Sequence, residues 1–232
     1  MEKWIWQHTD WPKFIWDKSA IANNLVKAHH LNGYINGCYI ENPNMGQHVL
    51  DALLINLLSS SAIENERLNA QSVRSSLARR LGISENQPYP QSERSEGLAN
   101  IMMDVLDHSK QDLSLNRLLQ WHQWLFPNLG VFNADLQVGG LRGDEVMQVV
   151  SGRLDQPIVH YEAPPRIDLP KQLDDFIVWF NFTRDHKQID PIIRAAITHL
   201  WFVTLHPFED GNGRLTRTLT DLALTQMDTQ SI

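Results

Sequence analysis

Hydrophobic residues recur at intervals of three and four positions through most of this 232-residue chain. The clearest stripe consists of Val49, Leu50, Leu53, Leu54, Leu57 and Leu58. Residues at this spacing lie on one side of an α-helix, where they can pack against a core. We expect this helix to continue to about residue 65. The same periodicity predicts helices over residues 17–31, 69–81, 95–109, 112–126, 170–186, 190–204 and 213–227.

Two segments have a different pattern. In residues 139–162, β-branched runs at 146–150 and 158–161 flank Ser151-Gly152 and predict a β-hairpin. At the N-terminus, residues 4–6 alternate as in a short strand or an extended arm. The region carries four tryptophans, which we expect to be buried anchors of a small helical domain and not a ligand cage: Trp4, Trp6, Trp11 and Trp16.

A polar stretch divides the chain. Residues 84–96 contain Pro88 and Pro90 and predict a loop, which we take as the boundary between domains at 1–94 and 95–232. The sequence ends about fifteen residues after Arg217 in a weak polar tail. Because a helix after Arg217 would need another element to cover it, we expect the second domain to be truncated at its C-terminal side.

Composition narrows the class of protein. An apolar content of 42% with 20% charged residues is typical of a globular domain. The net charge of −7 argues against a general binder of nucleic acid or anionic membrane, and the pair Arg79-Arg80 is too small for a nucleic-acid patch. A single cysteine, Cys38, excludes an intrachain disulfide and a cysteine metal cage. The N-terminus lacks signal-peptide features and no segment has the roughly 20 apolar residues of a membrane span, so we expect a cytoplasmic protein.

The most informative segment is His206–Arg217, HPFEDGNGRLTR, which lies between two predicted helices. Unpaired N–H groups and the positive end of the helix dipole favour anion binding at the start of the second helix. His206 can accept a proton from a hydroxyl near physiological pH. Asp210, beside the glycine turn, is a better candidate ligand for Mg²⁺ than Glu209.

The glycine turn and two arginines complete a candidate phosphate site. Gly211, Asn212 and Gly213 can supply backbone N–H groups and a side-chain donor to an oxyanion. Arg214 and Arg217, three positions apart on the helix, can donate to phosphates. Each residue alone has an ordinary structural explanation, such as a His-Pro turn or a solvated arginine. The order and completeness of the set favour a nucleotide-phosphate site beside a base.

This segment matches the HPFxxGNGRxxR signature of Fic-domain proteins, and the chain resembles that family over about residues 113–227. The resemblance implies a mainly α fold: a Fic-type helical bundle with one β-hairpin flap, plus an N-terminal helical accessory domain. It also implies a protein adenylyltransferase that transfers AMP from ATP to a Ser, Thr or Tyr hydroxyl of a target protein. The unchanged Gly213 favours adenylylation over phosphoryl transfer.

The resemblance assigns a role to each residue. His206 would be the general base, and Asp210 would hold Mg²⁺ on the nucleotide phosphates. Gly211, Asn212 and Gly213 would form the anion hole, while Arg214 would steady the phosphates and Arg217 would hold the γ-phosphate. The target segment would dock by backbone pairing on the flap, at Met147, Gln148, Val149, Val150 and Ser151.

A second, shorter pattern lies upstream. Ser60-Ser-Ala-Ile-Glu64-Asn65 matches (S/T)xxxE(G/N), which resembles the inhibitory helix of class II Fic proteins and would cover about residues 56–67. Ser60, Glu64 and Asn65 would be its key residues. A carboxylate at Glu64 can pair with Arg217, removing the partner of the γ-phosphate and adding negative charge where phosphate must bind.

Several alternatives stay open on the sequence. The same site could remove AMP from modified protein with Glu64 aligning a water, or the chain could be a regulatory module that senses nucleotide without turnover. Some relatives relieve inhibition by changing assembly, so a homo-oligomer is also open. Seven other histidines lack metal-ligand company and are expected to be ordinary surface or core residues: His29, His30, His108, His122, His160, His186 and His199.

Overall fold

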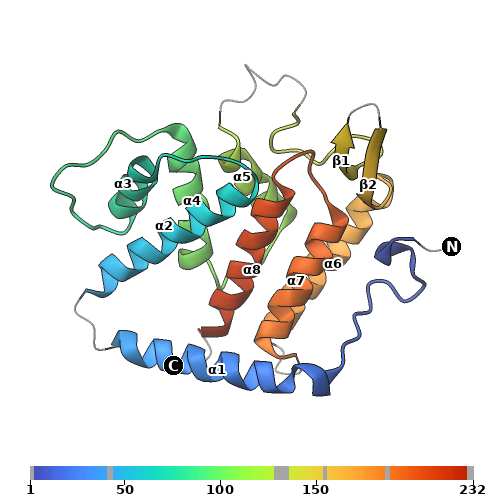
Figure 1. Cartoon of the computed structure of the whole chain (residues 1–232), viewed down its shortest axis with the longest axis horizontal. Coiled ribbons are helices and arrows are strands. Elements are labelled where there is room, and N and C mark those ends of the chain that lie inside the picture. The colour runs from blue at the N-terminus through green and yellow to red at the C-terminus, as the bar shows by residue number, and fades with distance from the viewer. Residues whose placement is uncertain (1–2, 41–43, 128–135, 154–155, 186–188, 229–232) are drawn as a thin grey trace.

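The computed structural model describes residues 3–40, 44–127, 136–153, 156–185 and 189–228 (Figure 1). Within them the fold is mainly helical with one two-stranded antiparallel sheet, which confirms the predicted fold class. None of the described helices is long and apolar enough to cross a membrane. The elements are η1 (Ile5–Gln7), α1 (Lys18–Ile40), α2 (Met45–Ile63), α3 (Ala70–Arg80), α4 (Glu93–Asp107), α5 (Leu115–Leu125), β1 (Gln148–Arg153), β2 (Gln156–Glu162), α6 (Leu169–Arg184), α7 (Pro191–Leu205) and α8 (Asn212–Asp228).

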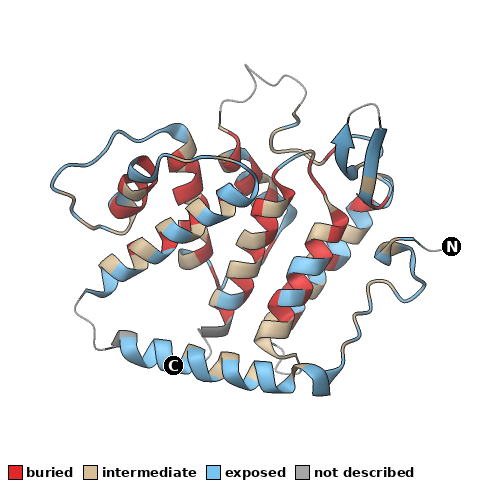
Figure 2. Cartoon of the chain, viewed as in Figure 1, coloured by how far each residue is buried: buried red, intermediate tan, exposed pale blue. Residues whose placement is uncertain are grey.

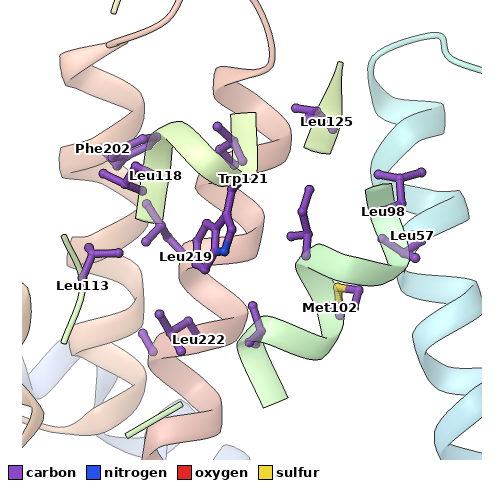
Figure 3. Close-up of a cluster of buried hydrophobic side chains, with 14 of the residues drawn as sticks. Leu57, Leu98, Met102, Leu113, Leu118, Trp121, Leu125, Phe202, Leu219 and Leu222 are labelled. Carbon is purple, nitrogen blue, oxygen red and sulfur yellow. The ribbon is translucent and has the colours of Figure 1, made fainter. Parts of the chain in front are cut away.

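The helices pack around an antiparallel pair formed by α7 and α8. Helix α6 lies against α7, whereas α4, α5 and α2 lie against α8 (Figure 1). The buried sides of these helices face one another, and most of α1 and the hairpin is exposed (Figure 2). Figure 3 shows side chains from five helices meeting in the core, among them Leu57, Met102, Trp121, Phe202 and Leu219. The hydrophobic cluster therefore continues across the polar stretch at residues 84–96.

The N-terminal arm, residues 3–16, differs from the predicted strand or extended arm because residues 5–7 form a 3-10 turn. The Gln7 carboxamide accepts the backbone N–H groups of Lys3 and Trp4 at 2.8 and 2.9 Å, so local side-chain bonds favour a turn. The four tryptophans are half-buried, whereas full burial was expected. The Trp11 ring meets Trp201 of α7 edge-on, with centroids 6.1 Å apart.

Helix α1 continues nine residues beyond the predicted end at residue 31. Gly33 and Gly37 lie inside it with open space around them. Glycine lowers helix stability by only about 1 kcal/mol relative to alanine, so these residues do not end the helix.

The predicted β-hairpin is confirmed, but its turn is displaced. Strand β1 extends through Ser151 and Gly152, which pair with Ile158 and Pro157. The predicted turn at Ser151-Gly152 is therefore wrong, because Gly152 adopts a positive φ of 93° within the paired strand. A β-bulge between Val149 and Val150 shifts the register, and such bulges bend and twist a strand. We call this hairpin the flap.

Candidate active site

The signature loop, residues 206–211, connects α7 to α8 and is held by buried contacts. The Asn212 side chain accepts from the Phe208 N–H at 2.9 Å and donates to the Phe208 carbonyl at 2.7 Å. Gly211 has a φ of 79°, and a Cβ there would lie 2.7 Å from Leu125 and 2.8 Å from Phe126. Only glycine combines this backbone angle with this close packing. The side-chain amide of Asn212, expected to donate to an oxyanion, thus holds the loop in this structure.

His122 packs against the signature loop and is fully buried. Its Nδ1 accepts the Gly139 N–H at 2.9 Å, so its Nε2 carries the proton and donates to the Asp210 carbonyl at 3.2 Å. The ring stacks on Phe208 with centroids 4.3 Å apart. Burial lowers the pKa of His122, which keeps the ring neutral. The sequence pattern predicted only an ordinary surface or core residue, and its contact with the loop depends on tertiary packing.

His206 ends α7 in a left-handed conformation, with a φ of 47°. Its Nδ1 lies 3.2 Å from the Val203 carbonyl, which can only accept, so Nδ1 carries the proton. Nε2 is therefore left with a free lone pair. Burial lowers the pKa of His206 below its usual 6.5, and Arg142 lowers it further, while the Val203 carbonyl, Glu64 and Asp210 oppose the shift. The geometry and the lowered pKa make His206 Nε2 a proton acceptor at neutral pH.

Arg142 holds the His206 turn, a role that the sequence did not indicate. The side chain is 2% exposed. Its guanidinium donates to the carbonyls of His206 at 2.9 Å and Pro164 at 2.5 Å, and its backbone N–H donates to the Pro207 carbonyl at 2.9 Å. A left-handed non-glycine residue is unfavourable and persists only where its surroundings fix it. Arg142 supplies such contacts on both sides of the His206–Pro207 bond.

We expect Arg142→Met to lower the free energy of unfolding by about 2–4 kcal/mol, because buried carbonyls that lose their donors cost about 1–3 kcal/mol each. Urea denaturation measures the change. Arg79→Met is the matched control, since the Arg79 side chain is 57% exposed and its ion pair with Glu96 should contribute less than about 1 kcal/mol. Equal midpoints for Arg142→Met and the unsubstituted chain would contradict this role.

The two acids of the loop have different surroundings. Glu209 accepts the Gln137 N–H at 2.8 Å and is directed to that neighbouring segment. The Asp210 side chain is 61% exposed next to the start of α8, 3.5 Å from Arg214. Among the described residues, no three His, Cys, Asp or Glu side chains gather as a metal site. Mg²⁺ commonly binds through one or two carboxylates together with substrate phosphates and waters, so Asp210 fits that requirement.

The Arg217 guanidinium is hydrogen-bonded to residues at the C-terminal end of α2. Its Nε donates to the Ser60 hydroxyl at 2.7 Å, and its Nη2 donates to the Ser60 carbonyl at 3.0 Å and the Glu64 carboxylate at 2.7 Å. The same carboxylate lies against Gly213, where a Cβ would be 2.2 Å from Glu64 Oε1. Glu64 therefore lies over the N-terminal turn of α8, where an anion would bind.

The local sequence explains this position of Glu64. Helix α2 ends at Ile63, and Asn65 follows in a left-handed conformation with a φ of 58°. The Asn65 N–H donates to the Ala62 carbonyl and the Glu66 N–H to the Ser61 carbonyl, both at 3.0 Å. These two bonds form a Schellman motif, in which Asn is tolerated at the left-handed position. The predicted inhibitory helix of residues 56–67 therefore ends at Ile63, and Glu64 caps it.

A second ion-pair group lies beside the first, and the sequence did not indicate it. Glu66 accepts from Arg214 at 2.7 Å and also contacts Arg94 of α4. Both guanidinium groups lie over the Phe126 ring, at 4.9 Å for Arg214 and 5.4 Å for Arg94. We call residues 60–66 the acidic segment. Its two glutamates are paired with both arginines of the signature.

The flap residues predicted to dock a target lie at one side of this site. Gln148, Val149, Val150 and Ser151 are exposed on β1, and Met147 precedes the strand. The Met147 carbonyl accepts the Ala163 N–H at 2.9 Å, which closes the base of the flap. Val149 and His206 line the same cavity. The fold thus brings the flap, the histidine, the glycine turn and both arginines to one end of α7 and α8.

Two family models match parts of the chain. The family model described as "Fic/DOC family" matches residues 112–224, and one described as "Domain of unknown function (DUF4172)" matches residues 4–83. The chain is 35% identical to "Protein adenylyltransferase fic-1" of Caenorhabditis elegans over 121 residues, which are 52% of this chain and 21% of that protein. The chain thus matches only about a fifth of this curated relative.

Two solved structures share the fold. A Fic domain containing signaling protein from Bacteroides thetaiotaomicron aligns with a TM-score of 0.58 at 18% identity, over 82% of this chain and 69% of that one. Fic-1 (residues 134–508) from C. elegans aligns with a TM-score of 0.58 at 24% identity, over 90% of this chain and 58% of that one.

Proposed function

Residues 112–224 of this chain belong to the Fic/DOC family, and on that basis we propose that the chain is a protein adenylyltransferase. It transfers AMP from ATP to a Ser, Thr or Tyr hydroxyl of a target protein. One observation carries the proposal: His206 presents an unprotonated Nε2 beside a helix N-terminus that bears Arg214 and Arg217. Nucleotidyl transfer to a hydroxyl requires a base next to a phosphate site.

The proposed reaction is an in-line displacement. His206 Nε2 takes the proton of the target hydroxyl as its oxygen forms a bond to the α-phosphorus of ATP. The bond between that phosphorus and the bridging oxygen breaks, and pyrophosphate leaves. Backbone N–H groups at the start of α8, together with Arg214 and Arg217, stabilise the phosphate charge. Asp210 would hold a Mg²⁺ ion, which would neutralise phosphate charge when bound.

In the proposed mechanism the acidic segment keeps this reaction slow. Glu64 accepts a hydrogen bond from Arg217 and lies against Gly213, at the start of α8 where the phosphate oxygens would bind. ATP can then bind productively only after Glu64 leaves. The side chain is 37% exposed, so it can move into solvent without disturbing the core.

Glu66 extends the inhibition to the other arginine. The Arg214 side chain is 8% exposed, and Glu66 accepts a hydrogen bond from its Nη1. Its Nε is buried and has no hydrogen-bond partner among the described residues. The nucleotide must therefore compete with Glu66 for Arg214 as it competes with Glu64 for Arg217. The acidic segment then acts through two ion pairs, each with its own arginine.

We expect Glu66→Gln, added to Glu64→Gly, to lower the KM for ATP about three- to tenfold relative to Glu64→Gly alone. The range corresponds to about 0.7–1.4 kcal/mol, which lies within the net contribution of one hydrogen bond. Initial rates of label transfer across ATP concentrations give the KM. Glu93→Gln makes the same charge change at an exposed position on α4 and should leave the KM unaltered. A KM for ATP that does not fall with Glu66→Gln would show that Glu66 takes no part in the inhibition.

Removal of AMP from modified protein is the second candidate, and one observation favours it. The Glu64 carboxylate lies against Gly213, in the signature that begins at His206, so it can orient a water at the α-phosphorus. The test uses Glu64→Gly chain labelled on itself as the substrate for the unsubstituted chain. Loss of label with release of AMP would support this activity, and stable label would exclude it.

A further inference from the structure

A cavity of about 480 Å³ lies beside His206 and is separate from the arginines. Three parts of the chain line it. The N-terminal arm provides Trp4 and Ile5, the flap provides Val149 and Tyr161, and α7 provides Leu200 and Val203. Apolar side chains thus form most of the wall, and the polar residues Lys3, His160, Thr204 and His206 complete it. The cavity connects the candidate base with the target-docking strand.

The walls of this cavity are fixed by specific contacts. Trp6 donates its indole N–H to the Glu162 carbonyl at the end of β2, at 2.7 Å. The Trp4 ring meets Tyr161 edge-on with centroids 5.5 Å apart, and the Tyr161 hydroxyl donates to the Thr204 carbonyl at 2.6 Å. Figure 1 shows the arm running from the start of α1 to the neighbourhood of β2. The arm, the flap and α7 therefore hold one another in place around the cavity.

The strand register indicates what enters the cavity. Val149 and Tyr161 are directly paired across the flap, so their side chains lie on the same face of the sheet. An extended peptide that adds to an edge of the flap continues the ladder about 4.8 Å away, and its residue in register points to that same face. One side chain of the peptide is thereby directed to the wall that Val149 and Tyr161 form.

We propose that this cavity binds a large apolar side chain, such as Leu, Met or Phe, of the target segment docked on the flap. The inference rests on the proposed adenylyltransferase function and adds a specificity determinant to it. Trp4 and Ile5 make the N-terminal arm part of the substrate site. The choice of target then depends on residues about 200 positions from the signature in the sequence.

The test uses Glu64→Gly chain, labelled ATP and a random peptide library that carries a fixed central Ser, Thr or Tyr. Sequencing of the labelled peptides should show one position enriched about tenfold or more in large apolar residues, in line with the burial of one such side chain. Ile5→Arg replaces an apolar part of the wall with a second cation beside Lys3 and should shift that position to Asp and Glu. Ile167→Arg, at a residue 86% exposed and outside the cavity, should leave the apolar preference intact.

The outcomes separate this inference from the proposed function. Labelled peptides without an apolar preference, or a preference that survives Ile5→Arg, would overturn the cavity assignment while the transferase activity stands. Self-labelling without any peptide labelling would overturn it too, because docking of an extended peptide is part of the inference. Absence of all label, on the chain itself and on peptides, would instead refute the transferase. Measurements of thermal unfolding and of ATP binding check that the Ile5→Arg variant is folded.

Discussion

Glu64→Gly is expected to raise self-adenylylation about 10- to 100-fold. The substitution removes a charge-assisted hydrogen bond from Arg217, and such bonds contribute about 1.5–3 kcal/mol. It also removes the carboxylate that lies against Gly213, so the N–H groups at the start of α8 are no longer covered by a negative charge. Both changes favour binding of the ATP phosphates in the position needed for attack.

Transfer of label from α-labelled ATP to the chain measures this effect. Glu64→Gln keeps the size of the side chain and one acceptor oxygen but loses the charge. Its rate of self-labelling should therefore lie between those of the unsubstituted chain and the Glu64→Gly variant. The double variant Glu64→Gly with His206→Ala should incorporate label at least about 10²-fold more slowly than Glu64→Gly, which separates catalysis from trapped nucleotide. A folded Glu64→Gly chain that binds ATP and labels itself no faster than the unsubstituted chain would refute inhibition by Glu64.

The helices were predictable because their apolar spacing reports directly on which side faces the core. Leu50, Leu53 and Leu57 of α2 are indeed buried, and so are Leu173, Phe176 and Phe180 of α6. The ends of elements were less predictable, because they depend on local interactions that leave little trace in the spacing of apolar residues. The predicted end of α1 was residue 31, but the helix continues to Ile40. The Gln7 carboxamide closes a turn where alternation had indicated a short strand or an extended arm.

The residues of the site also divide into those that the sequence could predict and those that it could not. The signature is contiguous, so its base, glycine turn and arginines could be recognised together. Glu66, Arg94 and Arg142 could not, because each acts on the signature from a distant position in the chain. Glu66 meets Arg214 across 148 residues, and Arg142 meets His206 across 64. Such pairs arise only when the helices pack, and no spacing rule in the sequence reports them.

Hydrogen-bond partners also distinguished roles that residue type alone left open. His122 and His206 are both histidines near the loop, yet Gly139 and Asp210 occupy both ring nitrogens of His122. In His206 only Nδ1 has such a partner, at the Val203 carbonyl. Of these two, His206 is therefore the one that can take a proton from a substrate. The same reasoning distinguishes Asp210, which is exposed next to α8, from Glu209, which is bonded to Gln137.

In the Glu64→Gly background, His206→Ala is expected to lower the rate of AMP transfer about 10²- to 10⁴-fold, the usual range for loss of a general base. His206→Asn is the companion variant, since it retains polarity and hydrogen bonding but cannot act as a base at neutral pH. Both variants should still bind ATP, because the arginines and the start of α8 are unchanged. Transfer that survives either substitution at more than about a tenth of the parent rate would assign the base elsewhere.

The pH dependence gives an independent test of the same residue. Burial lowers the pKa of His206 below 6.5, so the neutral, proton-accepting form predominates at pH 7. The rate at saturating ATP should therefore be constant above neutral pH and fall about tenfold per unit below the lowered pKa. Glu64 opposes that lowering, since its carboxylate favours the imidazolium. The acidic limb of Glu64→Gly chain should consequently lie at lower pH than that of the unsubstituted chain. A rate that still rises from pH 7 to 8.5 would mean that a group of higher pKa, and not His206, accepts the proton.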